Sequence, residues 1–253
     1  MTRQSVTIIA ALCIAALSGT ASAATLNGTG NVTPGIIFGS GNANGSFTGV
    51  TQGSLELGLR AKLRYNLAGQ PQNTFNYDGD HTYTFNSALS NAPANRSLFN
   101  FEWSINSNVD GHGTALNAFR YMIEVDLDPT RNVGNVVSYN ALGAGGTGYV
   151  LGKNSTGNGG GVDSVLGFFL GINTSNRNVA QNSVNMGFAP ISNPVGSGQY
   201  TIRLSAYSGA RLHATTAIDV VVDAPAPIPL PAAMPLLAAA LGGLGLMRRR
   251  RRA

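Results

Sequence analysis

Apolar and polar residues alternate strictly between residues 55 and 67. Leucine, alanine and tyrosine occupy the odd positions, while charged residues, glycine and asparagine occupy the even ones. A period of two places alternate side chains on opposite faces of a β-strand, whereas a helix would mix both sets on every face. The pattern predicts a long strand with one face on a core and the other in water.

Further strands with this alternation are expected at intervals bounded by turns. The clearest cover residues 82–87, 97–105, 118–128, 199–206 and 215–223. Weaker candidates cover residues 148–153, 165–172 and 184–188. Glycine, asparagine, aspartate and proline separate these segments, and no convincing helix lies between the two ends of the chain. We therefore expect an all-β fold, namely an antiparallel β-sandwich of jelly-roll-like type with about eight to ten strands. Trp103 aligns with the apolar face of its strand and is expected in the core.

The first 23 residues have the composition of a signal peptide. Arg3 precedes an apolar stretch at residues 6–17, and Ala21 and Ala23 supply the small residues of a cleavage site. We expect a signal helix here, with cleavage after Ala23. The single cysteine, Cys13, lies inside this segment, so the mature chain is expected to contain no disulfide.

The C-terminal residues combine a proline-rich entry, an apolar segment and a basic end. Residues 228–247 carry no charge and approach the length that crosses a bilayer. Because prolines crowd the first half of this segment, the transmembrane helix is expected over residues 234–247, with a length of about 21 Å. Five arginines follow it and would hold the C-terminus in the cytoplasm; they are Arg248, Arg249, Arg250, Arg251 and Arg252.

The order of these elements resembles a PEP-CTERM sorting tail in its Val-Pro-Leu-Pro-Ala variant. Pro229, Leu230, Pro231 and Ala232 match the motif, and Ile228 stands at the position of the valine. The resemblance covers only the C-terminal end of the chain. It implies an exosortase-type sorting protease and the membrane as partners, transient anchoring in the inner membrane, delivery to the outer surface or the extracellular space, and association with exopolysaccharide. An ordinary single-pass anchor is the alternative.

The charge of the chain changes once its two ends are set aside. The formal net charge is +5, but six of the 16 lysines and arginines lie in the signal segment and the arginine cluster. All 11 acidic residues lie between Glu56 and Asp223, so the body of the chain has 10 basic and 11 acidic residues. A nearly neutral body argues against nucleic acid as a partner.

The chain therefore divides into six expected segments. Residues 1–23 form the signal peptide, and residues 24–54 form a lead-in rich in glycine and asparagine, which is either flexible or contributes short edge strands. The β-sandwich domain follows at residues 55–223. A proline-rich spacer with the sorting motif covers residues 224–233, the transmembrane helix residues 234–247 and the cytoplasmic tail residues 248–253.

One acidic run is a candidate metal site. Glu124, Asp126 and Asp128 would share one face of their strand at steps of about 6.6 Å. Like charges at this spacing favour a nearby cation. The basic face of the strand at residues 55–67 is one expected partner, through cross-strand ion pairs. Calcium is the other, because it prefers carboxylate oxygens; no other cofactor is expected.

The remaining motifs do not suggest catalysis. Residues 143–148 match a G-x-G-x-x-G motif by letter, but a strand rather than a helix is expected after them. His81, His112 and His213 are isolated, and no serine lies in a strand-to-helix elbow. We therefore expect a non-enzymatic surface or matrix protein. The alternative is a lectin-like carbohydrate-binding module, with or without calcium, in which Phe75, Tyr77 or Tyr207 would stack on a sugar ring.

Overall fold

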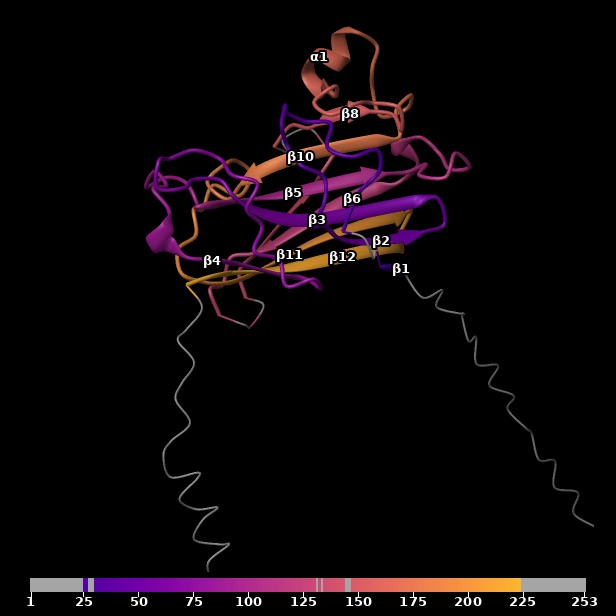
Figure 1. Ribbon diagram of the computed structural model, residues 1–253. Coiled ribbons are helices and arrows are strands. Elements are labelled where there is room, and N and C mark those ends of the chain that lie inside the picture. Colours follow the sequence, from indigo (N-terminus) through magenta and orange to yellow (C-terminus); the bar gives the residue numbers. More distant parts are fainter. Residues whose placement is uncertain (1–24, 27–29, 131, 133, 144–146, 224–253) are drawn as a thin grey trace, which may run out of the picture.

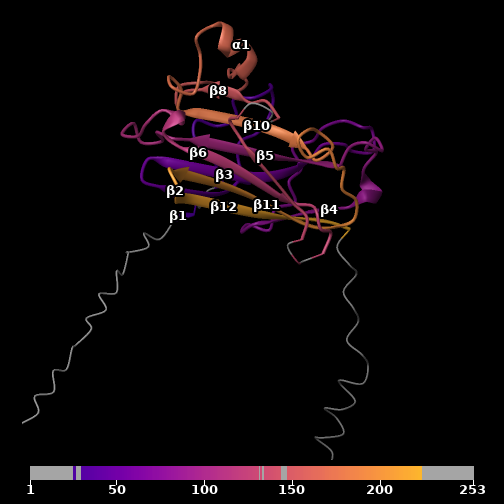
Figure 2. The same ribbon diagram turned by 180° about the vertical axis from the view of Figure 1, so that it is seen from behind.

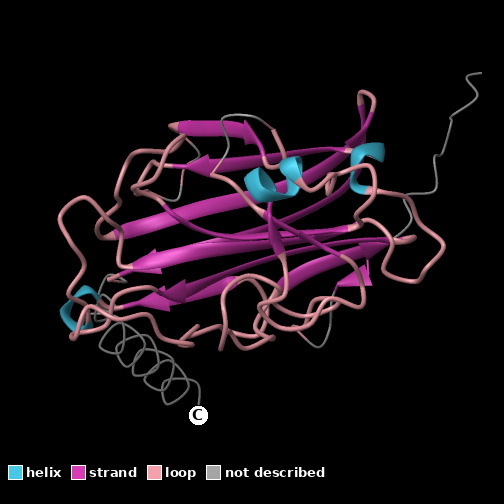
Figure 3. Ribbon diagram, turned by 90° about the horizontal axis from the view of Figure 1, so that it is seen from above, coloured by secondary structure: helices cyan, strands magenta, loops and turns pink. Residues whose placement is uncertain are grey.

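The computed structural model describes residues 25–26, 30–130, 132, 134–143 and 147–223. These residues form two β-sheets that lie face to face, with loops and very little helix around them (Figure 1; Figure 3). The expected signal peptide at residues 1–23 and the expected spacer, transmembrane helix and tail at residues 224–253 lie outside the described residues.

The first sheet, sheet A, has seven strands in the order β1-β2-β3-β5-β10-β8-β9, and every neighbouring pair is antiparallel. Its strands are β1 (Thr25–Leu26), β2 (Thr48–Gln52), β3 (Leu55–Leu63), β5 (Phe99–Asn106), β10 (Val179–Asn185), β8 (Val150–Gly152) and β9 (Val162–Asp163). The two longest, β3 and β5, pair at the centre of the sheet from Glu56–Asn106 to Leu63–Phe99.

The second sheet, sheet B, has five strands in the order β4-β12-β11-β6-β7. They are β4 (Thr82–Phe85), β12 (Arg211–Val222), β11 (Gly198–Ser208), β6 (Arg120–Asp126) and β7 (Val136–Asn140). The pair β4–β12 is parallel and the other pairs are antiparallel. Short helices connect the strands: the 3₁₀ turns η1 (Ser87–Leu89) and η2 (Leu116–Ala118), and α1 (Ser164–Phe169).

The expectation of an all-β fold is confirmed, and the five clearest expected strands correspond to β4, β5, β6, β11 and β12. The strand expected at residues 165–172 is wrong, because this segment forms α1 and the turn that follows it. The Asp163 carboxylate accepts hydrogen bonds from the backbone N–H groups of Val165 and Leu166, which is a helix N-cap. Gly171, at φ +68°, then supplies the left-handed residue that ends the helix.

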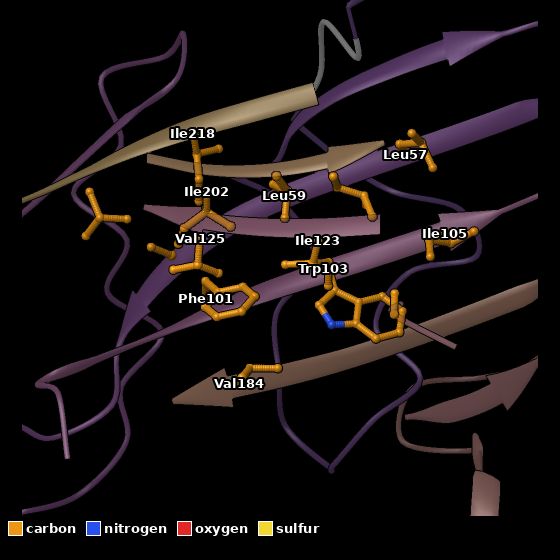
Figure 4. Packing of buried hydrophobic residues seen from close by; sticks show 14 of the residues in the cluster. Leu57, Leu59, Phe101, Trp103, Ile105, Ile123, Val125, Val184, Ile202 and Ile218 are labelled. Atoms are coloured by element: carbon orange, nitrogen blue, oxygen red, sulfur yellow. The ribbon is translucent and has the colours of Figure 1, made fainter. Parts of the chain in front are cut away.

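The core lies between the two sheets. Alternate residues of each central strand point inward, so that side chains of β3, β5 and β10 meet those of β6, β11 and β12 (Figure 4). Trp103 is fully buried among them, as its alignment predicted. Burial of one such large apolar side chain stabilises the fold by about 1.5–3 kcal/mol, so this continuous layer is the main source of stability.

The expectation that β3 turns a polar face to water is wrong. Eight of its nine residues are buried. Residues 30–47, which we call the covering segment, cross the outer face of sheet A and exclude water from it. Their approach is close: a Cβ atom on Gly58 of β3 would lie 2.6 Å from Cγ1 of Val32. Glycine is therefore needed at this point for the two backbones to pack.

Much of the expected lead-in at residues 24–54 packs on sheet A or pairs with it. Strand β2 pairs with β3 over its whole length, so the expected boundary between residues 54 and 55 falls in the turn of a hairpin. Val32, Ile36 and Phe47 form a small apolar cluster of their own above the sheet. Residues 30–54 are therefore packed as part of the sandwich.

Candidate functional site

The acidic run lies at the end of β6, on the outer face of sheet B. Glu124 forms an ion pair with Arg203 of β11, with 3.4 Å between Oε2 and Nη1. The expected pairing with the basic residues of β3 is wrong, because β3 belongs to the other sheet. Arg60 and Lys62 of β3 instead contact Glu102 of β5.

The other two carboxylates of the run hold a turn. Asp126 Oδ1 accepts hydrogen bonds from the backbone N–H groups of Asp128 (3.0 Å) and Gly134 (3.3 Å). Asp128 Oδ1 accepts one from Thr130 N–H at 2.9 Å, and this contact holds the pKa of Asp128 below its usual value. Over the described ranges, no three His, Cys, Asp or Glu side chains gather as a set of metal ligands. The structure therefore does not bring Glu124, Asp126 and Asp128 together as a set of metal ligands.

The outer face of sheet B is open and polar. Asp219 accepts hydrogen bonds from Thr201 Oγ1 at 2.7 Å and from Gln199 Nε2 at 2.9 Å. Ser205 and Thr215 bond to each other across β11 and β12 at 2.9 Å. A shallow cavity of about 110 Å³ opens on this face; it is lined by Glu124, Asp126, Val136, Thr201 and Arg203. Its carboxylates, hydroxyl and guanidinium are groups that hydrogen-bond to the hydroxyls of a small polyol.

The outer face of sheet A contains a buried ionic cluster that the sequence analysis did not find. Arg60 reaches Glu102 Oε2 with Nε at 2.6 Å and Nη2 at 2.5 Å, and both side chains are 0% exposed. Lys62 Nζ lies 3.0 Å from the other carboxylate oxygen. Burial lowers the pKa of Arg60, and the neighbouring Glu102 charge opposes that shift. Only the register of β3 against β5 places these three residues together, so no local sequence signal identifies them.

The covering segment completes this cluster. Arg60 Nη1 donates to the backbone carbonyls of Ala43 (2.8 Å) and Gly45 (2.7 Å). The guanidinium lies between two rings, with Cζ 4.3 Å from the Phe47 centroid and 4.6 Å from the Phe75 centroid. Arg60 therefore links sheet A to the covering segment.

Two more polar residues hold the covering segment. Gln181 of β10 accepts a hydrogen bond from Ile37 N–H at 2.8 Å and donates one to the Gly35 carbonyl at 2.6 Å. Glu56 of β3 accepts one from Thr33 N–H at 2.7 Å. Burial raises the pKa of Glu56, and the bonds from Thr33 only partly offset this effect. Together these contacts tie the segment to β3 and β10, which lie on either side of β5.

The aromatic side chains expected as sugar platforms already have partners. Phe75 stacks on Arg60, and Tyr77 stacks on Tyr83 with ring centroids 4.8 Å apart. Tyr207 lies on the open face of sheet B, half-buried, with Arg120 Cζ 4.8 Å from its ring centroid. Of the three, Tyr207 is the one next to the open face.

The histidines and the glycine-rich loop are spread over the molecule. His81 Nδ1 lies 2.7 Å from the neighbouring Asp80 carboxylate, and the backbone N–H of His112 donates to Asp110. His213 packs on the ring of Phe119. Residues 144–146 of the G-x-G-x-x-G match lie outside the described residues, and β8 follows the loop, as expected. These contacts do not point to a catalytic centre.

The residues expected to direct export cannot be placed in the fold. Ala21, Ala23, the motif at residues 229–232 and the arginines at residues 248–252 lie outside the described residues. In the part of the chain that the structure describes, no helix has the length and apolarity to cross a membrane. Comparison of the chain with protein-family models, with curated proteins and with solved structures found no match.

Proposed function

We propose that the chain is an exported, non-enzymatic protein of the cell surface or extracellular matrix. The signal peptide at residues 1–23 directs export, and the PEP-CTERM-like tail engages an exosortase-type protease after the helix at residues 234–247 enters the inner membrane. The exported body is a jelly-roll-like sandwich, an idea supported by the way the chain passes back and forth between sheets A and B. Exopolysaccharide is the expected surrounding material.

One observation supports a structural role for the body above all others. Each of the 11 carboxylates already has a hydrogen-bond or ion-pair partner within the chain. They are Glu56, Asp78, Asp80, Glu102, Asp110, Glu124, Asp126, Asp128, Asp163, Asp219 and Asp223. Hydrolysis of a glycan needs two carboxyl groups that converge on a cleft. Carboxylates used for internal bonding fit a scaffold better than a glycan hydrolase.

Mass spectrometry of the surface-exposed protein from its own host tests this proposal. We expect an N-terminus at Ala24 and a C-terminus before Arg248, because both targeting segments would be removed. The Pro229→Ala/Pro231→Ala variant should accumulate with its tail intact, whereas Pro225→Ala, in the spacer outside the motif, should be processed normally. A surface form that still ends in Ala253 would contradict sorting by this tail.

A second candidate function is binding of carbohydrate on the open face of sheet B. The cavity beside Thr201 and Arg203 favours it, because hydroxyl and charged groups line it together with one apolar side chain. Calorimetric titration with the polysaccharide of the host, with and without a chelator, tests both the binding and its dependence on calcium. Loss of binding in Thr201→Val would support the site, with Thr84→Val of β4 as the matched control. Flat titrations in both conditions would reject it.

A further inference from the structure

Helix α1 and the residue after it carry a cluster of exposed apolar side chains. Phe168 is 78% exposed, Phe169 76%, Val165 68%, Leu170 60% and Leu166 55%. We call these five residues the apolar tip. Single exposed apolar residues are common on proteins, but a contiguous group of this kind marks a surface that binds something apolar.

The apolar tip is held in a defined shape. Asp163 caps the start of the helix, and the backbone N–H of Leu170 bonds to the Leu166 carbonyl at 3.2 Å. Ile172 N–H returns to the carbonyl of Gly167 at 2.8 Å. Gly167 is buried, and a Cβ there would lie 2.7 Å from the Ile172 carbonyl oxygen, so glycine is required for this fold-back. The apolar side chains therefore project from a hydrogen-bonded support.

The position of the tip sets it apart from the rest of the molecule. It follows β9, the outermost strand of sheet A, while β1 forms the opposite edge of the same sheet. Figures 1 and 2 show α1 projecting beyond β8 on one side, with β1, β4 and β12 on the other. The tip is convex, and β12, which leads into the C-terminal segment, lies far from it.

Shape and size decide which partner fits the tip. A stable protein interface buries about 800 Å² on each side, and one phenylalanine contributes about 150–250 Å² even when fully buried. The two phenylalanines supply about 300–500 Å² at most. The other three side chains are smaller and only 68%, 60% and 55% exposed, so a second copy of the chain would need further contacts around the tip. A fluid bilayer needs no complementary pocket, because its acyl chains adapt to a small convex apolar projection.

The charge of the segment that carries the tip is also compatible with an anionic lipid surface. Between residues 147 and 178 the charged residues are Lys153, Asp163 and Arg177. The Asp163 carboxylate caps the helix, and its charge offsets one of the two basic charges, so this stretch of the chain carries a net charge of +1. Basic residues next to an apolar insertion are attracted to anionic headgroups.

From these observations we propose that the apolar tip inserts into the interfacial region of a lipid bilayer, as a membrane contact separate from the C-terminal segment. Phe168 and Phe169 enter deepest, since they are the most exposed and their rings meet edge to face at 5.6 Å between centroids. The proposal does not depend on export or on processing of the tail.

Fluorescence of the full chain with lipid vesicles tests this contact. Phe168→Trp reports on the tip, and Leu67→Trp, at a residue 63% exposed in the turn after β3, is the matched control. Both variants keep the buried Trp103 and the same apolar C-terminal segment, so these contributions cancel. With vesicles of phosphatidylcholine and phosphatidylglycerol, the emission of Phe168→Trp should shift to shorter wavelength. Lipids brominated on the acyl chain should quench it at least about twofold more than that of Leu67→Trp.

Two results would overturn the proposal. Equal quenching of the two variants would show that the tip has no preference for lipid. A blue shift of Phe168→Trp that needs no vesicles and grows with protein concentration would assign the tip to self-association. Adding Val165→Ser and Phe169→Ser to Phe168→Trp should abolish the vesicle-dependent shift while the circular dichroism spectrum stays unchanged, which separates loss of contact from loss of folding.

Discussion

The outer faces of the two sheets carry the same kind of ion pair, but it is buried on sheet A and exposed to water on sheet B. Each carries an arginine–glutamate pair across neighbouring strands. Arg60 and Glu102 in sheet A are 0% exposed, whereas Arg203 and Glu124 in sheet B are 50% and 36% exposed. The covering segment makes this difference, because it lies over sheet A and nothing comparable in the described residues lies over sheet B. The environment of a polar sheet face therefore depends on a segment far from it in sequence.

The contrast has an energetic consequence. An exposed ion pair contributes about 0–1 kcal/mol, because water and salt screen it. Two charges taken out of water lose their hydration, and removal of one partner then leaves the other buried and uncompensated, which costs about 3–5 kcal/mol. The covered face is therefore the sensitive one, although its residues resemble those of the open face.

The largest expected effect is that of Arg60→Met. This change removes the ion pair that Arg60 makes with the buried Glu102 carboxylate. It also removes the two hydrogen bonds that Arg60 donates to the covering segment. We expect the free energy of unfolding to fall by about 3 kcal/mol, the low end of the range, because Lys62 stays beside Glu102. Urea unfolding followed by fluorescence measures it.

Arg203→Met is the matched control for the open face, with an expected loss of less than about 1 kcal/mol. Equal losses for Arg60→Met and Arg203→Met would show that the covering segment does not exclude water from sheet A in solution.

A smaller effect is expected for Gly58→Ala. The added Cβ would lie 2.6 Å from Val32, so the covering segment must move outward. Overpacking of this kind costs about 1–3 kcal/mol, from which the better strand propensity of alanine recovers about 0.5–1 kcal/mol. Residues 30–47 should also become more accessible to protease. Gly157→Ala, where no atom lies within 4 Å of the added Cβ, should change neither quantity.

The effect of Glu56→Gln should depend on pH. Burial raises the pKa of Glu56 in the folded state, so folding disfavours its charged form, and this cost is present at neutral pH and disappears as the pH falls below the unfolded pKa. The Tm of Glu56→Gln should therefore exceed that of the unmodified chain at pH 7, and the difference should vanish near pH 4. A difference that is constant with pH would contradict a raised pKa.

The smallest effect is expected for Asp223→Asn at the end of β12. It is a decrease in Tm, opposite in sign to the increase expected for Glu56→Gln. The N–H of Ser87 and the hydroxyl of Ser197 each donate to this partly exposed carboxylate at 2.7 Å and lower its pKa. Its stabilisation is present above the unfolded pKa and is lost as the pH falls through the folded pKa. Asp223→Asn should lower the Tm slightly at pH 7 and not at pH 3. A larger deficit at pH 3 than at pH 7 would contradict this sign.

Local patterns in the sequence predicted which segments form strands. They did not predict which other parts of the chain pack against those strands. Alternation identified β3, and the alignment of Trp103 placed it correctly in the core, because the period of two is a property of the strand itself. The same alternation led to the wrong expectation that the even positions of β3 face water. The apolar run of α1 looked like a strand, because apolar residues of a short segment carry no period that separates helix from strand.

For the candidate sites, too, the sequence shows the spacing of the residues but not their partners in space. The sequence shows that Glu124, Asp126 and Asp128 alternate, but it does not show that Arg203 lies beside the first and that turn N–H groups occupy the other two. Partners of this kind come from strand register, which depends on the packing of both sheets at once.

By itself, the sequence determined the all-β character, the turns, the main strands and the near-neutral charge of the body, since each follows from residues close together in the chain. Only the tertiary structure decided that residues 30–47 cover sheet A, that Arg60 meets Glu102 and that the apolar tip stands free of the core. These features depend on contacts between distant segments. Burial, and with it the energy of every charge and apolar group, is set by what the rest of the chain places on top of them.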